Sequence, residues 1–166
     1  MRRLAVLIAA AAAAVAAIAA LAGNGNASHP GSRTIVLQEL DRGSVFKFID
    51  HPPRSRGRGE RATISTGDQF AFRTPVQNQA GQRAGALHAL CTATRGGRNF
   101  GRATFMCDGS YRLTDGQIAL QVVFSGEGPT VVAVTGGTGA YEGARGSCTS
   151  THTRIGDRDT CHIVTF

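Results

Sequence analysis

Residues Val131–Gly146 have the sequence VVAVTGGTGAYEGARG, a β-branched run followed by glycine-rich turn residues and a second run of small residues. A similar Thr-Gly-Gly-Thr-Gly motif occurs in nucleotide-binding folds. There it lies between the first strand and a helix, and a long α/β chain follows it. Here only 20 residues follow Gly146, and many of them are β-branched or carry hydroxyl groups. The stretch therefore predicts a β-hairpin with its turn at Thr135–Gly139, because glycine adopts positive φ at little steric cost.

The rest of the chain repeats this pattern of short strand-like runs separated by turn residues, with no sustained helical period. Successive hairpins favour an all-β, antiparallel up-and-down barrel, which leaves no open sheet edge, and a two-sheet sandwich is the alternative. The expected strands are Thr34–Leu40 continuing through Val45–Ile49, Gln69–Gln77, Arg83–Thr94, Arg102–Tyr111, Gln117–Ser125, Thr130–Thr135, Ala144–Thr153 and Asp159–Phe166.

The N-terminus has the pattern of an export signal. Arg2 and Arg3 precede the uncharged run Leu4–Ala22, which ends in the small-x-small text Ala-Leu-Ala. The run is also long enough to span a bilayer, so an uncleaved membrane tether is the alternative. We expect a signal peptide at residues 1–22, a flexible leader at 23–33, a barrel domain at 34–166, and secretion of that domain.

Four cysteines form an even set, which in the oxidising compartment reached by export fits two disulfides. Cys91 and Cys107 lie on consecutive predicted strands at similar distances from the turn between them, and so do Cys148 and Cys161. Of the three connectivities that four cysteines allow, we therefore expect the cross-strand bridges Cys91–Cys107 and Cys148–Cys161. The spacing of zinc ligands is absent, so no metal site is expected.

The chain has a net charge of +7, and four of its arginines lie in residues 51–61, HPPRSRGRGER. Binding to nucleic acid or to an acidic surface is one interpretation of such a segment. We favour a solvated loop between strands, because the segment has no aromatic side chain on which bases could stack. No nucleic-acid partner is expected, and a membrane is expected as a partner only through an uncleaved signal.

Four segments stand in order along the chain: Gln38–Arg42 with Ser44, Gly67-Asp68 followed by Phe72, Arg83–Gly85 with Cys91, and Ala133–Gly139 with Glu142-Gly143 and Gly146. Together they resemble the allene oxide cyclase family, and the last segment is also similar to plant dirigent proteins. The resemblance implies an eight-stranded barrel, a homo-oligomer that is trimeric in plants, and an interior apolar pocket. It also implies a small apolar or aromatic ligand and no metal or organic cofactor.

The resemblance further implies the pocket-binding residues, but it assigns no catalytic residue. The position of the cyclase glutamate is taken by a valine and that of the pocket tyrosine by a phenylalanine. Cys91 stands at the pocket cysteine, where a bridge would remove its thiol. True allene oxide cyclase activity is therefore not expected. The implied pocket residues are Val36, Gln38, Ser44, Thr74 and Phe124.

The phase of the first strand decides which acidic side chains can reach the interior. If Gln38 faces inward, alternation turns Val36 and Leu40 inward and Glu39 outward, unless a bulge near Asp41 changes the phase.

Two functions stay open. One is a barrel that binds a small molecule and steers its cyclisation or radical coupling, as an isomerase-like cyclase or a dirigent-type protein. The other is a non-catalytic exported barrel that binds a ligand or has a structural role. An ionisable pocket residue with a shifted pKa would favour the first.

Overall fold

The computed structural model describes residues 31–52, 62–126 and 130–165, and β-strands dominate this part of the chain. The predicted signal peptide, most of the predicted leader and most of the arginine-rich segment lie outside the described residues. No helix in the described ranges is long and apolar enough to cross a membrane. The elements are β1 (Gly31–Glu39), β2 (Val45–Ile49), β3 (Gln69–Asn78), β4 (Arg83–Arg95), the 3-10 helix η2 (Phe100–Arg102), β5 (Thr104–Leu113), β6 (Gly116–Ser125), β7 (Thr130–Gly139), β8 (Arg145–Thr153) and β9 (Gly156–Thr165).

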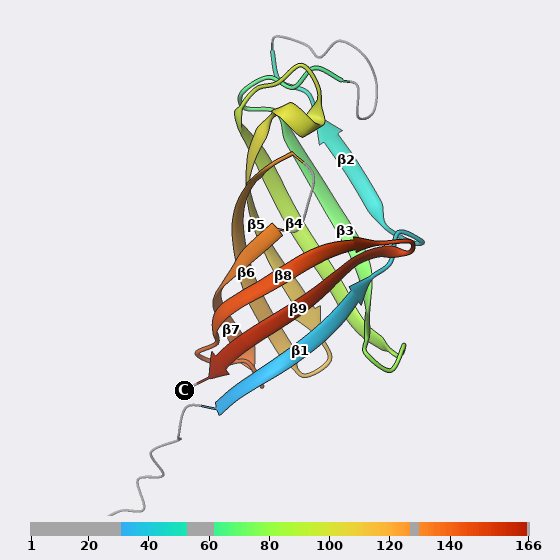
Figure 1. Cartoon of the computed structure of the whole chain (residues 1–166), viewed down its shortest axis with the longest axis vertical. Helices are drawn as coiled ribbons and strands as arrows, with labels where there is room; N and C mark the ends of the chain where they lie inside the picture. The colour runs from blue at the N-terminus through green and yellow to red at the C-terminus, as the bar shows by residue number, and fades with distance from the viewer. Residues whose placement is uncertain (1–30, 53–61, 127–129, 166) are drawn as a thin grey trace, which may run out of the picture.

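The strands form one antiparallel sheet that closes on itself (Figure 1). Neighbours in the chain pair as hairpins from β3 to β9, and β1 pairs along its length with β9. Closure comes from β1 and β3, where Leu37–Glu39 pair with Val76–Asn78. The predicted eight-stranded barrel is confirmed, and β2 is one extra strand that pairs with β3.

The first predicted strand is interrupted, and this break separates β1 from β2. Residues 40–44 turn there, with Gly43 at φ +87°. The Ser44 hydroxyl donates a hydrogen bond to the Leu40 carbonyl at 2.7 Å, which stabilises the turn. At the other end of β1, Gly31–Arg33 pair with β9, so these last residues of the predicted leader belong to the sheet.

The hairpin at Val131–Gly146 is present, but its turn lies further along the chain than predicted. β7 continues to Gly139, at φ +62°, and residues 140–143 form the turn. A Cβ at Gly137 would lie 2.2 Å from the Tyr141 carbonyl oxygen. The prediction placed the turn wrongly because this glycine allows a close backbone approach within the strand, rather than a reversal of the chain.

Both predicted disulfides are confirmed. Cys91 and Cys107 are directly opposite on β4 and β5, and Cys148 and Cys161 are directly opposite on β8 and β9. Two such bridges in a small barrel fit an extracellular protein.

The barrel interior contains two clusters of buried side chains. One is built around Leu37, Tyr111 and Ile118, and it includes the Cys148–Cys161 bridge. The other is built around Phe70 and Phe105, and it includes the Cys91–Cys107 bridge. Residues of both clusters line the cavity described next.

Candidate functional site

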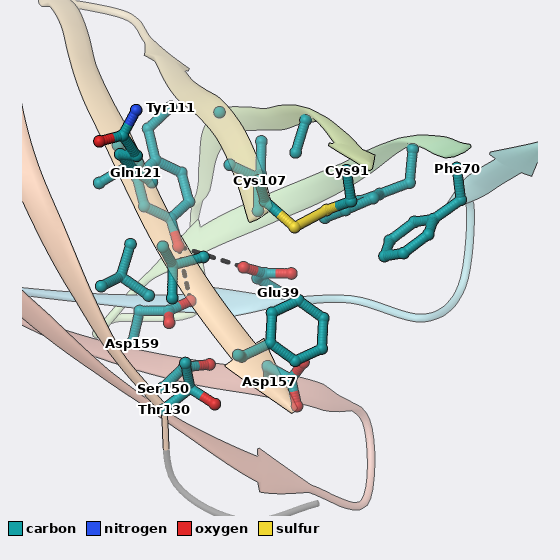
Figure 2. Close-up of a pocket in the computed structure, with 18 of the residues that line it drawn as sticks. Glu39, Phe70, Cys91, Cys107, Tyr111, Gln121, Thr130, Ser150, Asp157 and Asp159 are labelled. Atoms are coloured by element: carbon teal, nitrogen blue, oxygen red, sulfur yellow. Dashed lines mark hydrogen bonds between the residues drawn. A yellow bond between two sulfur atoms is a disulfide. The ribbon is translucent and has the colours of Figure 1, made fainter. Parts of the chain in front are cut away.

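A cavity of about 330 Å³ lies inside the barrel, which is enough room for a small organic molecule (Figure 2). One part of its wall is aromatic and the other part is acidic. It is lined by Glu39, Phe70, Phe72, Leu87, Ala89, Cys91, Phe100, Cys107, Gly109, Tyr111, Leu120, Gln121, Val122, Phe124, Thr130, Val132, Ser150, Asp157 and Asp159.

The aromatic wall is held by contacts between rings from four different elements. Phe70 of β3 meets the fully buried Phe105 edge-on at 5.1 Å between centroids. Phe105 stacks on Phe100 of η2 at 4.6 Å and on Phe124 of β6 at 5.5 Å. Because each ring is packed against another, this wall is a preformed apolar surface suited to a flat or unsaturated ligand.

On the acidic wall, which also includes Asp157, the side chains of Glu39, Tyr111 and Asp159 share hydrogen bonds (Figure 2). The Tyr111 hydroxyl lies 2.6 Å from Oδ2 of Asp159 and 3.1 Å from Oε1 of Glu39. Tyr111 is 1 % exposed, Asp159 3 % and Glu39 9 %. Leu37 is opposite Asp159 in the β1–β9 ladder, so Glu39, two residues further on, lies diagonally across from Asp159 on the same face.

The pKa of Glu39 is raised from 4.5 to about 9, mainly by burial and then by the negative charge and hydrogen bond of the adjacent Asp159. Asp157 raises it too, whereas the Tyr111 hydrogen bond lowers it. Burial, followed by the charges of the two carboxylates, also raises the pKa of Tyr111 well above 10. At neutral pH Glu39 is therefore a neutral carboxylic acid and Tyr111 a neutral phenol, both able to donate hydrogen bonds.

Of the five predicted pocket residues, only Phe124 lines this cavity. The Gln38 amide instead donates hydrogen bonds to the Thr153 hydroxyl and to the Asp157 carbonyl. The Ser44 and Thr74 hydroxyls lie 3.2 Å apart, beside the turn that follows β1. Thr74 is buried on β3, two residues along from the lining residue Phe72.

The sequence left the phase of β1 conditional on Gln38 facing inward, and the structure does not meet that condition, because neither Val36 nor Gln38 lines the cavity. Leu37 is 2 % exposed in the core and Glu39 faces the cavity, so the odd-numbered positions of this strand point inward. Because side chains alternate, a phase error of one residue moves every side chain to the opposite face. Glu39 therefore needs no bulge to reach the interior.

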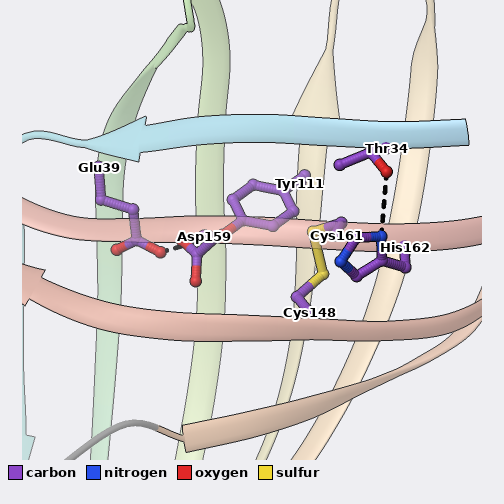
Figure 3. Close-up of a disulfide and its surroundings, with 7 residues drawn as sticks. All are labelled: Thr34, Glu39, Tyr111, Cys148, Asp159, Cys161 and His162. Atoms are coloured by element: carbon purple, nitrogen blue, oxygen red, sulfur yellow. Dashed lines mark hydrogen bonds between the residues drawn. A yellow bond between two sulfur atoms is a disulfide. The ribbon is translucent and has the colours of Figure 1, made fainter.

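The sequence analysis did not identify Tyr111 and Asp159 as site residues, although their spacing from the bridged cysteines indicates that both face inward. Tyr111 is four residues from Cys107 and Asp159 is two residues from Cys161, so each shares an inward phase with a bridged cysteine. Figure 3 shows Glu39, Asp159 and Tyr111 in one view with the Cys148–Cys161 bridge. Among the described residues, no group of three or more His, Cys, Asp or Glu side chains is placed to hold a metal ion.

The sequence matches no protein-family model and no curated protein. Solved structures do match. The pterocarpan synthase dirigent protein GePTS1 is 13 % identical with a TM-score of 0.58, covering 83 % of this chain and 86 % of its own. A pyocyanin demethylase is 18 % identical with a TM-score of 0.57, covering 80 % and 99 %. The Diels-Alderase AbmU from Streptomyces koyangensis is 12 % identical with a TM-score of 0.52, covering 90 % and 78 %. The chain thus has the fold of the dirigent-like and related cyclase barrels.

Proposed function

We propose that this protein is a secreted barrel that binds a small apolar or aromatic molecule in its interior and steers its cyclisation or coupling, without allene oxide cyclase activity. The observation that carries the proposal is Glu39, a carboxyl group kept protonated at neutral pH and facing an aromatic cavity. An ionisable pocket group with a strongly shifted pKa is the feature that separates a catalytic barrel from a purely binding one.

The two walls have complementary roles in such a reaction. The packed phenylalanine rings hold an apolar ligand in one orientation, which lowers the entropic cost of ring closure or coupling. When a ligand binds, the single O–H of Glu39 turns from Asp159 to a carbonyl or ether oxygen of the ligand, which makes the adjacent carbon more electrophilic. Tyr111 and Asp159 are positioning residues, because they hold the Glu39 carboxyl in place through hydrogen bonds.

The structural neighbours support the proposal through their shared fold. By their names, one is a dirigent protein that is a pterocarpan synthase and another is a Diels-Alderase. The same barrel fold therefore occurs in proteins that are named for bond-forming reactions. The two disulfides support the secreted location.

The binding part of the proposal is tested with N-phenyl-1-naphthylamine, a neutral aromatic dye that fluoresces in apolar surroundings. Phe124→Trp should block the cavity and abolish the fluorescence gain. Val123→Trp is the matched control, because Val123 is the adjacent residue and is 63 % exposed. Absence of dye binding to the unmodified protein, or equal binding by both variants, would refute an interior ligand site.

The catalytic part is tested by native mass spectrometry of the non-reduced protein secreted by its own host, which reports retained ligand, cleavage of the signal and subunit number. The compound recovered is then incubated with the unmodified protein and with Glu39→Gln, and products are separated by chromatography. A product formed by the unmodified protein, with bound ligand but slower turnover in the variant, supports steering by Glu39. A ligand that emerges unchanged from both would instead identify a non-catalytic binding barrel.

A further inference from the structure

A second hollow lies on the barrel wall along β3, β4 and β5, and its character is basic. This groove of about 450 Å³ is lined by three arginines and a histidine around small residues of β4. Its lining residues are Arg73, Arg83, Ala84, Gly85, Ala86, His88, Arg112, Leu113 and Thr114.

Strand register brings these cationic side chains to one face. Arg73 of β3 is opposite His88 of β4, and Arg112 of β5 is opposite Ala86 of β4. β3 and β5 lie about 10 Å apart across β4, a gap that two arginine side chains can reach over from opposite sides. Tyr111 faces the interior cavity, so alternation places Arg112 on the outer face, with the sheet between the two sites.

The floor of the groove is built from small residues. At Gly85 the backbone has φ +153°, and a Cβ would lie 2.0 Å from the Arg112 carbonyl oxygen, so only glycine fits. Ala86, which is opposite Arg112, also lines the groove and has only a methyl group for a side chain. The small floor leaves the space in which a ligand could meet the guanidinium groups.

The charges of these arginines have no partner among the residues that the structure describes. Within the described ranges, none of Arg73, Arg83 and Arg112 forms an ion pair or a side-chain hydrogen bond. Asp108 lies on the same strand as Arg112, but its Oδ1 accepts a hydrogen bond from the Gln121 amide at 2.9 Å. Gathering like charges on one face raises the free energy of the protein unless an anion binds there.

We propose that this groove binds phosphate groups through Arg73, Arg83 and Arg112. The planar guanidinium donates paired hydrogen bonds that match the oxygens of phosphate, and it stays charged at every physiological pH. The site is separate from the interior cavity and does not rest on the function proposed for it. The same chemistry would recognise inorganic phosphates, a phosphate polymer or a phospholipid headgroup.

The test measures binding of inorganic pyrophosphate by calorimetry at low ionic strength. The double variant Arg73→Gln/Arg112→Gln should bind at least about tenfold more weakly, because two of the three donors are lost. Arg98→Gln/Arg102→Gln is the matched control: it removes the same charge from exposed residues at η2 and its flank, so its affinity should change less than about twofold. Urea unfolding midpoints equal to that of the unmodified protein establish that the barrel is intact in both double variants.

Two further probes distinguish the sources of phosphate. Polyphosphate is titrated in solution, and phosphatidylcholine vesicles with and without phosphatidylglycerol are tested by sedimentation. Binding that depends on the groove arginines for any of these probes supports the site and identifies its source. Equal weakening by both double variants would show a diffuse charge effect and overturn the proposal, as would absence of binding to all three probes.

Discussion

Replacing Glu39 with glutamine should remove a one-proton pH dependence from the stability of the barrel. The pKa of Glu39 is about 9 in the folded protein, against 4.5 ordinarily, because the side chain is buried beside Asp159. Between these values the folded state holds a proton that the unfolded state has released. The stabilisation that this proton provides is complete below about pH 4.5 and is lost as the pH rises through about 9.

The size of the effect follows from the proton count. One extra proton in the folded state lowers the free energy of unfolding by about 1.4 kcal/mol for each unit of rising pH. From pH 6 to pH 8 the unmodified protein should therefore lose about 2.7 kcal/mol through this group. Glutamine at position 39 cannot titrate, and its amide can still donate a hydrogen bond to Asp159.

Urea unfolding of the disulfide-intact protein at several values between about pH 5.5 and about pH 8.5 measures this slope. The slope for Glu39→Gln should differ from that of the unmodified protein by about 1.4 kcal/mol per pH unit. Glu142→Gln is the matched control, because it removes a carboxyl group from the exposed hairpin turn and should leave the slope as it was. Parallel slopes for Glu39→Gln and the unmodified protein would show that Glu39 does not hold a proton in the interior.

Three other changes test the packing around the site. Tyr111→Phe deletes a buried hydroxyl 2.6 Å from a carboxylate oxygen and should cost about 1–3 kcal/mol in urea unfolding; an unchanged midpoint would contradict that contact. The double variant Cys148→Ser/Cys161→Ser removes a bridge that closes a loop with a sequence separation of 13, and it should lower the free energy of unfolding by about 3 kcal/mol. An unchanged melting temperature would show that the bridge does not restrict the unfolded chain. Gly137→Ala places a Cβ 2.2 Å from a carbonyl oxygen and should destabilise the hairpin strongly, whereas Gly136→Ala meets nothing closer than 3.7 Å; equal melting temperatures would refute this role of Gly137.

Much of the fold was predictable because its signals are local. β-Branched runs and turn residues predicted the strands, and the equal spacing of Cys91 and Cys107 from their turn predicted a bridge between paired positions. The hairpin turn after β7 was misplaced, since Gly137 has the same composition signal as a turn glycine. A Cβ there would also lie 2.8 Å from the Gln117 carbonyl oxygen on β6, and the local sequence does not show this approach between strands.

The sequence by itself determined successive antiparallel hairpins with two cross-strand disulfides and favoured a barrel over a sandwich, because strand periodicity, turn residues and cysteine spacing are properties of neighbouring residues. It did not determine which face of β1 points inward, since alternation specifies two faces and only packing chooses between them. Barrel closure made that choice by bringing Glu39, Tyr111 and Asp159 together from β1, β5 and β9. The raised pKa of Glu39 followed from the same closure, because desolvation and a nearby carboxylate arise only when distant strands enclose one space.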